Sequence, residues 1–556
     1  MNLIINHLSI PFEKDGINEY IAAASKKLDI GKERLSILKI LSKALDIKDK
    51  EQFVYKISLA VRIAPPFKNR QNLPEYTESA EPEANPVKTS AAETNHSKTR
   101  PAKIQKSNPQ QTATQQTKTA KAKPRPIIVG FGPSGMFAAL ELLDRGVKPR
   151  IFERGKKIEE RSTDVQQFIS QRKINPESNI QFGEGGAGSY SDGKLFSRRN
   201  NNSSHVNRVL KTFVKFGAPE EIEYISKPHL GTDLLCRIVR NIRLHILERG
   251  GEINYSSKMT DILISDGAAT GIVINGEKEY VSEDIFIALG HSARDTFEML
   301  HEKGVAIEQR PISVGARIEH PAKTINLMRY GKKYCDCPEL GAATYSLNHT
   351  NRALRRGVYT FCMCPGGEVV NASSSQGLMA VNGMSDSQRA SRFSNAALVV
   401  PCHLEDYGSD HPLAGIGFQK KIEEKAFDAG GGSWSVPGQN LMDFIEDKPS
   451  AALNENSYKM GAVPGNIRDI FPSFVIQELL TAFDKWKTEV PLFVSDQAIL
   501  LGAETRTSSP LRIKRNKEHE SVNVKNLLPI GEGAGYAGGI TSSAADAIRA
   551  VAMRAL

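Results

Sequence analysis

A glycine-rich turn stands between an apolar run and a helical pattern near residue 130. The apolar residues 127–129 precede Gly130, Gly132 and Gly135, which have the G-x-G-x-x-G spacing, and residues 136–143 follow as a predicted amphipathic helix. In this pattern the first glycine permits a tight turn, the second lets the backbone approach a pyrophosphate, and the third lets helix and strand pack closely. Because a helix N-terminus offers free N–H groups to phosphates, the segment predicts a dinucleotide site.

An acidic residue follows at the distance that such a site requires. Residues 149–153 form a second predicted strand, which ends in Glu153 a little over 20 residues beyond the glycines. A carboxylate at this place holds ribose hydroxyls in dinucleotide-binding folds. Arg154 comes next, and its position fits either a cofactor contact or an ordinary surface cation. The fingerprint by itself leaves NAD and FAD open as the dinucleotide.

Three further segments have glycines where backbone would face a ligand. Residues 180–195 form a second glycine-rich loop, which indicates backbone lying against a flat or charged ligand, a string of tight turns, or a flexible surface loop. Residues 285–289 are a buried-type strand that ends in Gly290. Residues 527–541 again place a glycine-rich turn before a C-terminal helix.

Four of the six cysteines form two Cys-x-Cys pairs, Cys335/Cys337 and Cys362/Cys364, with Cys402 and His403 further on. Four thiolates can build a zinc or iron–sulfur site. The spacing argues against one, because structural zinc sites prefer Cys-x-x-Cys and alternate residues of a strand face opposite sides. We therefore expect no metal site. A redox-active thiol at Cys362 or Cys364 is an alternative to small buried residues beside a glycine turn.

Several histidines and arginines lie in polar, motif-like contexts: His291, Arg317, His320 and Arg506. A catalytic acid or an anion clamp can be built from such residues. Side chains of these types near a cofactor also act simply as hydrogen-bond partners. The sequence therefore assigns no catalytic residue.

The elements that position these residues fall into several parts. Residues 1–72 predict a small α/β domain, with strands at 3–5 and 53–61, a helix at 17–28 and an ambiguous segment at 35–45. Residues 73–126 are rich in Pro, Thr, Lys, Gln, Ala and Ser, and so predict a disordered basic linker. From residue 127 to about 310 strands and helices alternate, residues 311–500 are richer in loops, and residues 501–556 return to a strand and a helix.

Length, charge and hydropathy exclude some classes of protein. The chain has 556 residues with 40% hydrophobic and 24% charged side chains, which suits a globular protein with a large core. Residues 86–126 hold nine Lys/Arg and one acid, and so account for +8 of the net charge of +10. The nearly neutral remainder does not favour a nucleic-acid partner. No apolar run approaches a membrane span, no secretory signal is recognisable, and six cysteines are no disulfide framework, so we expect a cytoplasmic location.

The chain resembles the FAD-dependent oxidoreductases of the glutathione-reductase-like superfamily. It resembles most the bacterial uncharacterised FAD-dependent, or NAD(FAD)-utilising dehydrogenase, family. The motifs that carry the closer resemblance cover residues 127–556: residues 185–195, 228–233, 290–295, 361–367, 504–510 and 531–540. The resemblance implies an α/β fold with a Rossmann-like FAD-binding domain (127–310 and 501–556), an inserted α+β substrate-side domain (311–500) and the small N-terminal α/β domain.

The resemblance also implies roles for individual residues toward FAD. The pyrophosphate would lie on Gly130, Gly132, Pro133, Ser134 and Gly135, and the adenosine on Glu153, Arg154 and the backbone at Met259. The ribityl chain and flavin ring would pass Gly185, Gly186, Ala187, Gly188, Ser189, Gly290, Gly531, Glu532, Ile540 and Thr541. Glu532 departs from the superfamily, which more often has Asp there. The C-terminal helix would direct its N-terminus at the flavin ring.

No second strand-G-x-G-x-x-G-helix unit is present. NADH or NADPH, if it is the electron donor, would therefore bind without a Rossmann domain of its own. The sequence predicts an FAD-dependent oxidoreductase of unknown small-molecule substrate. Two alternatives stay open: a flavoenzyme that acts on RNA or another large anionic substrate, and a non-catalytic FAD-binding redox sensor. The oligomeric state is not predicted.

Overall fold

The computed structural model describes residues 1–77, 124–195 and 204–554. The linker predicted over residues 73–126 lies mostly outside these ranges. Residues 1–76 contain a three-stranded antiparallel sheet in the order β1–β3–β2 and one α-helix. The helix predicted at 17–28 is confirmed, and the ambiguous segment is a strand because it pairs with β3 along its whole length. The bounds are β1 Asn2–Pro11, α1 Ile17–Leu28, β2 Leu35–Asp46 and β3 Val54–Ile63.

A five-stranded parallel sheet begins after the linker, so the rest of the chain contains a mixed α/β fold. Its strands are short and stand in the order β22–β10–β4–β5–β6. They are β22 Leu527–Pro529, β10 Ile285–Ile287, β4 Ile127–Val129, β5 Arg150–Phe152 and β6 Glu252–Asn254. From β4 the chain continues to β5 on one side, whereas β10 lies on the other. The carboxyl ends of β4 and β10 therefore form a topological switch point, the edge of such sheets where ligands bind.

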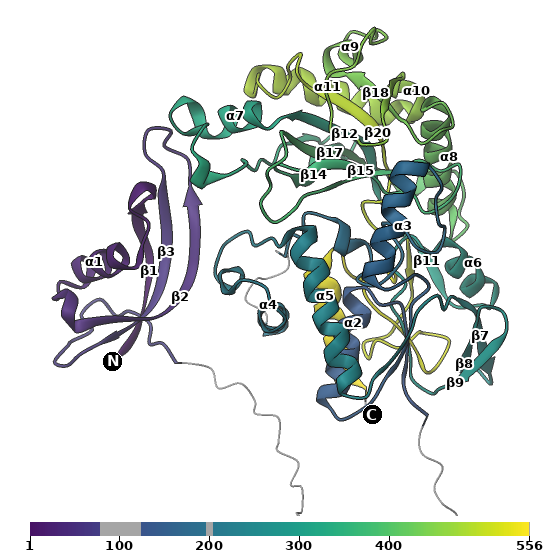
Figure 1. Ribbon diagram of the computed structural model, residues 1–556, viewed down its shortest axis with the longest axis horizontal. Coiled ribbons are helices and arrows are strands. Elements are labelled where there is room, and N and C mark those ends of the chain that lie inside the picture. The colour runs from purple at the N-terminus through teal and green to yellow at the C-terminus, as the bar shows by residue number, and fades with distance from the viewer. Residues whose placement is uncertain (78–123, 196–203, 555–556) are drawn as a thin grey trace, which may run out of the picture. The chain divides into compact units, whose positions relative to one another are not determined.

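Helices and a small sheet cover the two faces of this parallel sheet (Figure 1). The side chain of Ile128 packs with helices α2, α5 and α12, whereas Ile127 and Val129 pack on the opposite face with α6 and the sheet β7–β9. The strand is apolar on both faces because both are covered. The elements are α2 Pro133–Asp144, α5 Gly231–Glu248, α6 Arg294–Glu302, α12 Ile540–Met553, β7 Met259–Ser265, β8 Ala268–Ile274 and β9 Lys278–Val281.

Helix α2 corrects one sequence prediction. The pattern of residues 136–143 predicts an amphipathic helix, but every residue from Ser134 to Leu143 is buried. The helix lies between α12, α5 and the sheet, so no face is left for water. The amphipathic prediction is wrong because other elements cover every face of the helix, and Glu141, the one charged residue of 136–143, is buried in ion pairs with Arg145 and Arg208.

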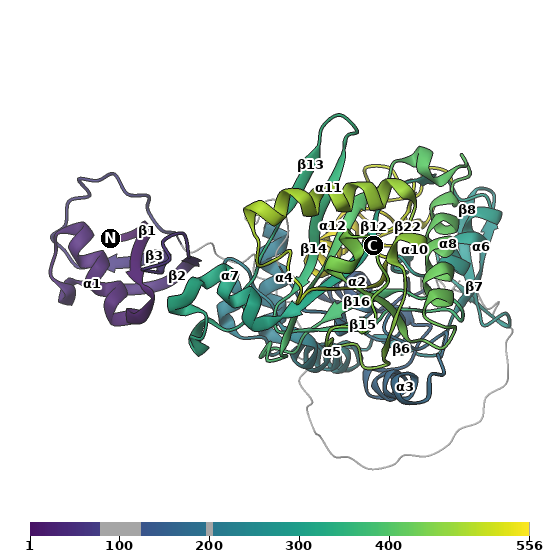
Figure 2. The ribbon, with the colours of Figure 1, turned by 90° about the horizontal axis from the view of Figure 1, so that it is seen from above.

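A seven-stranded sheet forms the other large layer, in the order β13–β14–β17–β12–β20–β18–β19. Helix α11 lies across β14 and β17, as Figure 2 shows from above. The strands are β12 Ser313–Pro321, β13 Asn348–Asn351, β14 Arg356–Cys364, β17 Phe393–Pro401, β18 Val436–Asn440, β19 Ala462–Pro464 and β20 Ile499–Glu504. The helices are α7 Ala322–Tyr334, α8 Ala414–Ala429, α9 Leu441–Ile445, α10 Ile467–Ile470 and α11 Ser473–Glu489.

The remaining elements connect these layers. Two-stranded sheets pair β11 Ile307–Gln309 with β21 Leu511–Ile513, and β15 Glu368–Asn371 with β16 Val381–Met384. Two further α-helices are α3 Ile158–Gln171 and α4 Ser204–Lys215. Short 3-10 turns are η1 Phe12–Lys14, η2 Lys32–Arg34, η3 Ala187–Tyr190, η4 Glu220–Glu223, η5 Pro338–Leu340 and η6 Leu404–Tyr407. Within the described ranges, no helix is long and apolar enough to cross a bilayer.

Candidate functional site

A cavity of about 870 Å³ opens at the carboxyl ends of β4 and β10. This volume lies in the upper part of the range of small-molecule and cofactor sites. Most of the residues that the sequence predicts for cofactor binding line it: Gly130, Gly132, Pro133, Ser134, Glu153, Arg154, Gly186, Ala187, Gly188, Met259, Gly290, Glu532, Ile540 and Thr541. Segments more than 400 residues apart in the chain therefore share one cavity.

Four predicted residues lie behind the cavity wall and not in it: Gly135, Gly185, Ser189 and Gly531. Two of them are glycines because other atoms leave no room. A Cβ on Gly135 would lie 2.0 Å from the carbonyl oxygen of Gly130, and a Cβ on Gly531 would lie 1.9 Å from Oγ of Ser134. These glycines let the loops and helices behind the wall approach one another.

Gly132 is different, because the chain itself leaves room for a side chain there. Its φ is −83°, which any residue adopts, and a Cβ would lie 3.6 Å from the nearest atom, Cα of Gly186. The bare backbone of Gly132 faces the cavity at the start of α2, whose first N–H groups have no partner within the helix. Pro133 occupies the first helical position, where its missing N–H costs nothing. This cradle fits a pyrophosphate group.

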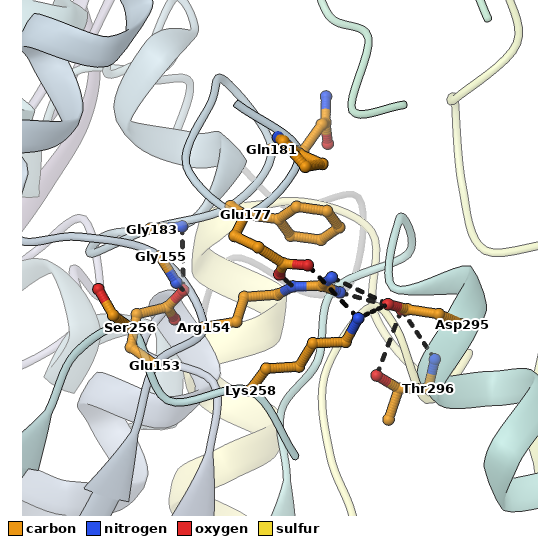
Figure 3. Close-up of polar contacts among 12 residues, drawn as sticks. Glu153, Arg154, Gly155, Glu177, Gln181, Gly183, Ser256, Lys258, Asp295 and Thr296 are labelled. Carbon is orange, nitrogen blue, oxygen red and sulfur yellow. Dashed lines mark hydrogen bonds and ion pairs between the residues drawn. The ribbon is translucent and has the colours of Figure 1, made fainter. Parts of the chain in front are cut away.

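The carboxylate of Glu153 accepts hydrogen bonds from the backbone of three loops, and Figure 3 shows those from Gly155 and Gly183. Its Oε2 accepts a hydrogen bond from N of Phe131 at 2.8 Å. Its Oε1 accepts from N of Gly155 at 2.9 Å and from N of Gly183 at 3.0 Å. Only 5% of the residue is exposed, and that part faces the cavity. The sequence missed this backbone role, and the predicted ribose contact stays a prediction.

Arg154 belongs to a charged group beside Glu153. Its guanidinium donates two hydrogen bonds to Asp295, at 3.0 and 2.9 Å, and one to Glu177 at 2.7 Å. Nζ of Lys258 lies 2.6 Å from Asp295, and Figure 3 shows both cations converging on that carboxylate. Burial alone would raise the pKa of Asp295, but Arg154 and Lys258 hold it well below its usual range. Two cations thus balance two acids, and Arg154 is not an ordinary surface cation.

The C-terminal segment closes another side of the cavity. Helix α12 begins at Ile540, close to the start near Thr541–Ser542 that the sequence predicts. Oγ1 of Thr541 donates to the carbonyl of Leu195 at 2.6 Å. A Cβ on Gly188 would lie 3.0 Å from Cγ1 of Ile540, so the second glycine-rich loop lies against the start of this helix. Glu532 lies in the turn before it and accepts from N of Gly539 at 3.3 Å. Burial raises the pKa of Glu532 to about 7.

His291 and Arg506, far apart in the sequence, both reach the cavity. Nη1 of Arg506 donates to Oγ of Ser292 at 3.2 Å, and that hydroxyl lies 3.1 Å from Nδ1 of His291. Because the Ser292 hydroxyl donates its proton to Gln181 at 3.0 Å, Nδ1 of His291 carries the proton and Nε2 is the accepting nitrogen. Burial, with help from Arg506 and a second arginine, lowers the pKa of His291 to about 3. The imidazole is therefore neutral at pH 7.

Arg317 and His320 lie away from the cavity, inside the seven-stranded sheet. Nη1 of Arg317 lies 3.0 Å from Oε2 of Glu504, and its Nε donates to the side chain of Asn395 at 2.6 Å. His320 hydrogen-bonds the carbonyl of Phe493 at 2.8 Å and is 1% exposed. Both side chains have internal partners, so neither forms the anion clamp that the sequence allowed.

All six cysteines are free thiols. Cys362 lines the cavity with a φ of +47°, at a bulge where β14 changes register against β17. Cys364 is fully buried, its Sγ accepts from Nη2 of Arg317 at 3.5 Å, and burial raises its pKa to about 11. Among residues 1–77, 124–195 and 204–554, no group of three or more His, Cys, Asp or Glu side chains is placed to hold a metal ion.

Comparison with known proteins gives a family and a full-length relative. Residues 311–507 match the family model described as FAD-dependent protein, C-terminal domain-like. An uncharacterized protein of Clostridium beijerinckii is 39% identical over 551 residues, which cover 99% of this chain and 98% of that protein.

Two solved structures are distantly similar to this chain. The open conformation of a flavocytochrome c3 fumarate reductase is 10% identical over 78% of each chain, with a TM-score of 0.31. FqzB is 13% identical over 78% of this chain and 77% of its own, with a TM-score of 0.34. At these TM-scores the similarity supports no inference about the function of this chain.

Proposed function

Since this chain belongs to one family with the uncharacterized protein of Clostridium beijerinckii, and residues 311–507 match the C-terminal domain of FAD-dependent proteins, we propose that it is an FAD-dependent oxidoreductase. One observation carries the proposal. The glycine loop of residues 130–135 ends the central strand at the switch point and opens into a cavity large enough for a cofactor, which the start of the C-terminal helix also lines.

The residues of the cavity fit the parts of FAD in one direction. The backbone at Gly132 and the N-terminus of α2 would hold the pyrophosphate. Glu153, Arg154 and Met259 would lie along the adenosine, and Gly186 to Gly188 would lie along the flavin. The N-terminus of α12 then supplies a partial positive charge where a reduced flavin carries negative charge. FAD itself supplies the transfer of a hydride or electrons when bound.

The chain's own polar groups orient what lies beside the flavin. Nε2 of His291 can accept a hydrogen bond from an N–H or O–H group, because the neighbouring serine fixes the proton on Nδ1. Burial and the neighbouring arginines keep the pKa of this imidazole low, so it stays uncharged at pH 7. Its role is therefore to position a polar group rather than to carry charge.

The visible absorption spectrum of the purified protein tests the proposal. We expect a flavin spectrum that bleaches under anaerobic conditions when NADH or NADPH is added. Absence of bound flavin, also after incubation with FAD, would overturn the proposal. If flavin is bound but neither nucleotide reduces it, FAD remains the assigned cofactor and the electron donor must be a compound other than a pyridine nucleotide.

Two other functions predict different results. A redox sensor would bind flavin and change its reduction state without turnover with any acceptor. A flavoenzyme acting on RNA would copurify with nucleic acid and bind it with an affinity that falls steeply with salt. The steady-state rate with artificial acceptors, measured beside RNA binding at two salt concentrations, separates these functions from a small-molecule oxidoreductase.

A further inference from the structure

Three basic side chains line the cavity: Lys194, Lys227 and Arg389. They come from three separate segments: the loop after η3, the loop before α5, and the loop between β16 and β17. Thr541, in the first turn of α12, donates a hydrogen bond to the carbonyl of Leu195. Lys194 directly precedes Leu195 in the chain and therefore lies close to the start of α12. The proposed flavin position lies at the same helix terminus.

Two of these cations share a single carboxylate. Nζ of Lys194 lies 2.9 Å from Oδ2 of Asp192, and Nε and Nη2 of Arg389 lie 2.9 and 2.5 Å from its two oxygens. Asp192 is 1% exposed, and the side chains of Lys194 and Arg389 are 21% and 14% exposed. This partly buried group therefore has one positive charge more than its acid balances. A positive charge held away from water is costly unless an anion lies beside it.

The neighbouring titratable groups do not remove this excess. Arg317 and Glu504 balance each other. Burial raises the pKa of Cys364, so its thiol is uncharged, and burial together with Arg389 lowers the pKa of His229, so its imidazole is neutral at pH 7. Lys227 is exposed at the cavity edge and has no ion pair with any residue that the structure describes. It adds a second positive charge on the solvent side.

At two other places in the cavity the cations have acidic partners. At the adenosine end, Arg154 and Lys258 face Glu177 and Asp295, so that end is balanced. Arg506, which follows β20, pairs with Glu423 and also donates to Ser292 in the loop after β10. Lys194 and Arg389, in contrast, share one acid and keep an excess positive charge.

We propose that Lys194 and Arg389, with Lys227 at the edge, bind an oxyanion group of the substrate beside the flavin, so that the substrate is a small organic acid or a phosphorylated compound. The inference rests on the proposed function, because the position of the flavin is taken from that proposal. Lys194 supplies charge-assisted hydrogen bonds, and Arg389 keeps part of its guanidinium toward the cavity while Asp192 holds the rest in place.

Isothermal titration calorimetry on the FAD-loaded protein tests the inference, with succinate, inorganic phosphate and uncharged succinamide as probes. The flavin spectrum is recorded at each addition. We expect succinate or phosphate, but not succinamide, to bind and to perturb the flavin absorption. Binding of succinate alone would indicate an organic acid, and binding of phosphate alone would indicate a phosphorylated substrate.

Lys194→Met is the informative variant, because it leaves Asp192 paired with Arg389 and so removes the excess charge without stranding an acid. Loss of a charge-assisted hydrogen bond should weaken the anion Kd by about tenfold to a hundredfold. Lys194→Arg should restore most of the affinity. Lys459→Met, which removes an exposed lysine paired with Glu368, is the matched control and should bind as the wild type does.

The outcomes separate the inference from the proposed function. Flavin content is measured first in every variant, and protein that never takes up FAD overturns the proposed function. Calorimetry without FAD then still tests the anion site, because Lys194 and Arg389 belong to the protein. The inference is overturned if neither succinate nor phosphate binds, if succinamide binds equally well, or if the Kd is unchanged in Lys194→Met. Binding that leaves the flavin spectrum unchanged overturns the location beside the flavin.

Discussion

Glu423 and Arg506 form a buried ion pair at the cavity wall, with Nη2 of Arg506 3.1 Å from Oε2 of Glu423. The carboxylate is fully buried and also receives two hydrogen bonds from Arg294, both at 2.8 Å, and one from Thr505 at 2.6 Å. One acid thus holds two arginines. Glu423 lies on α8, whereas Arg294 follows β10 of the parallel sheet and Arg506 follows β20 of the seven-stranded sheet. The pair therefore connects the parallel sheet with the seven-stranded one.

Glu423→Gln should destabilise the fold strongly, because it leaves two buried guanidinium groups without an acid. Breaking a buried pair in this way costs about 3–5 kcal/mol. Arg506→Met should cost less, since Arg294 still pairs with Glu423. Urea unfolding followed by circular dichroism gives both free energies of unfolding. An Arg506→Met variant that is the less stable of the two would contradict the assignment of Glu423 as the shared partner.

Gly132→Ala and Gly135→Ala should separate cofactor binding from folding. The Cβ at position 132 meets only ordinary contact with Gly186 but extends into the phosphate cradle, so this variant should fold and lose FAD affinity. The Cβ at position 135 would meet the carbonyl of Gly130 at 2.0 Å, so this variant should lose at least about 1–3 kcal/mol of stability. The melting temperature of the FAD-free protein and an FAD titration measure the two effects. Equal melting temperatures for both variants would refute this distinction.

FAD affinity should fall as the pH rises through 7, because Glu532 then ionises beside the cofactor. Burial raises the pKa of this carboxyl to about 7, so it is protonated at pH 6 and charged at pH 8.5. The charged form repels the anionic cofactor, which should weaken the Kd of FAD by about tenfold, or 1.4 kcal/mol. Fluorescence titrations at both pH values measure it. Glu532→Gln should show no such dependence, and a slope that survives in this variant would assign the effect to another group.

The stability of the protein should depend on pH through Glu319. This residue is fully buried on β12, accepts from N of Ser457 at 2.7 Å and also from the Ser457 hydroxyl, and burial raises its pKa to about 7. Below pH 4.5 both the folded and the unfolded chain hold the proton, and the stability is complete. As the pH rises from 4.5 to 7, the unfolded chain releases the proton and the folded chain keeps it, so stability is lost.

Glu319→Gln isolates this contribution, because the amide has nearly the same shape and no titration. Between pH 4.5 and pH 8 the wild type should lose about 3 kcal/mol relative to the variant, at 1.36 kcal/mol per pKa unit. Urea unfolding of both proteins across this range provides the measurement. Parallel pH profiles would show that Glu319 does not titrate in the folded protein above its ordinary range.

Local structure could be predicted from the sequence where neighbouring residues decide it. The turn at Gly130 and the start of the C-terminal helix, predicted near Thr541–Ser542 and observed at Ile540, follow from glycine conformation and from helix patterns over a few residues. The segment at Leu35–Asp46 could not be predicted in this way, because only its pairing with β3 makes it a strand. The burial of α2 on every side likewise depends on helices that come later in the chain.

The glycine loop, the acid that follows it and the family resemblance can be recognised without a structure, because each of those signals is contiguous in the chain. Only the tertiary structure decided that Glu153 fastens three loops, that Glu423 holds two arginines, and that Lys194 and Arg389 share Asp192. Such polar contacts join residues up to about two hundred positions apart and follow no sequence period. They form because a buried charge must find a partner, and the topology of the two sheets decides which partner is within reach.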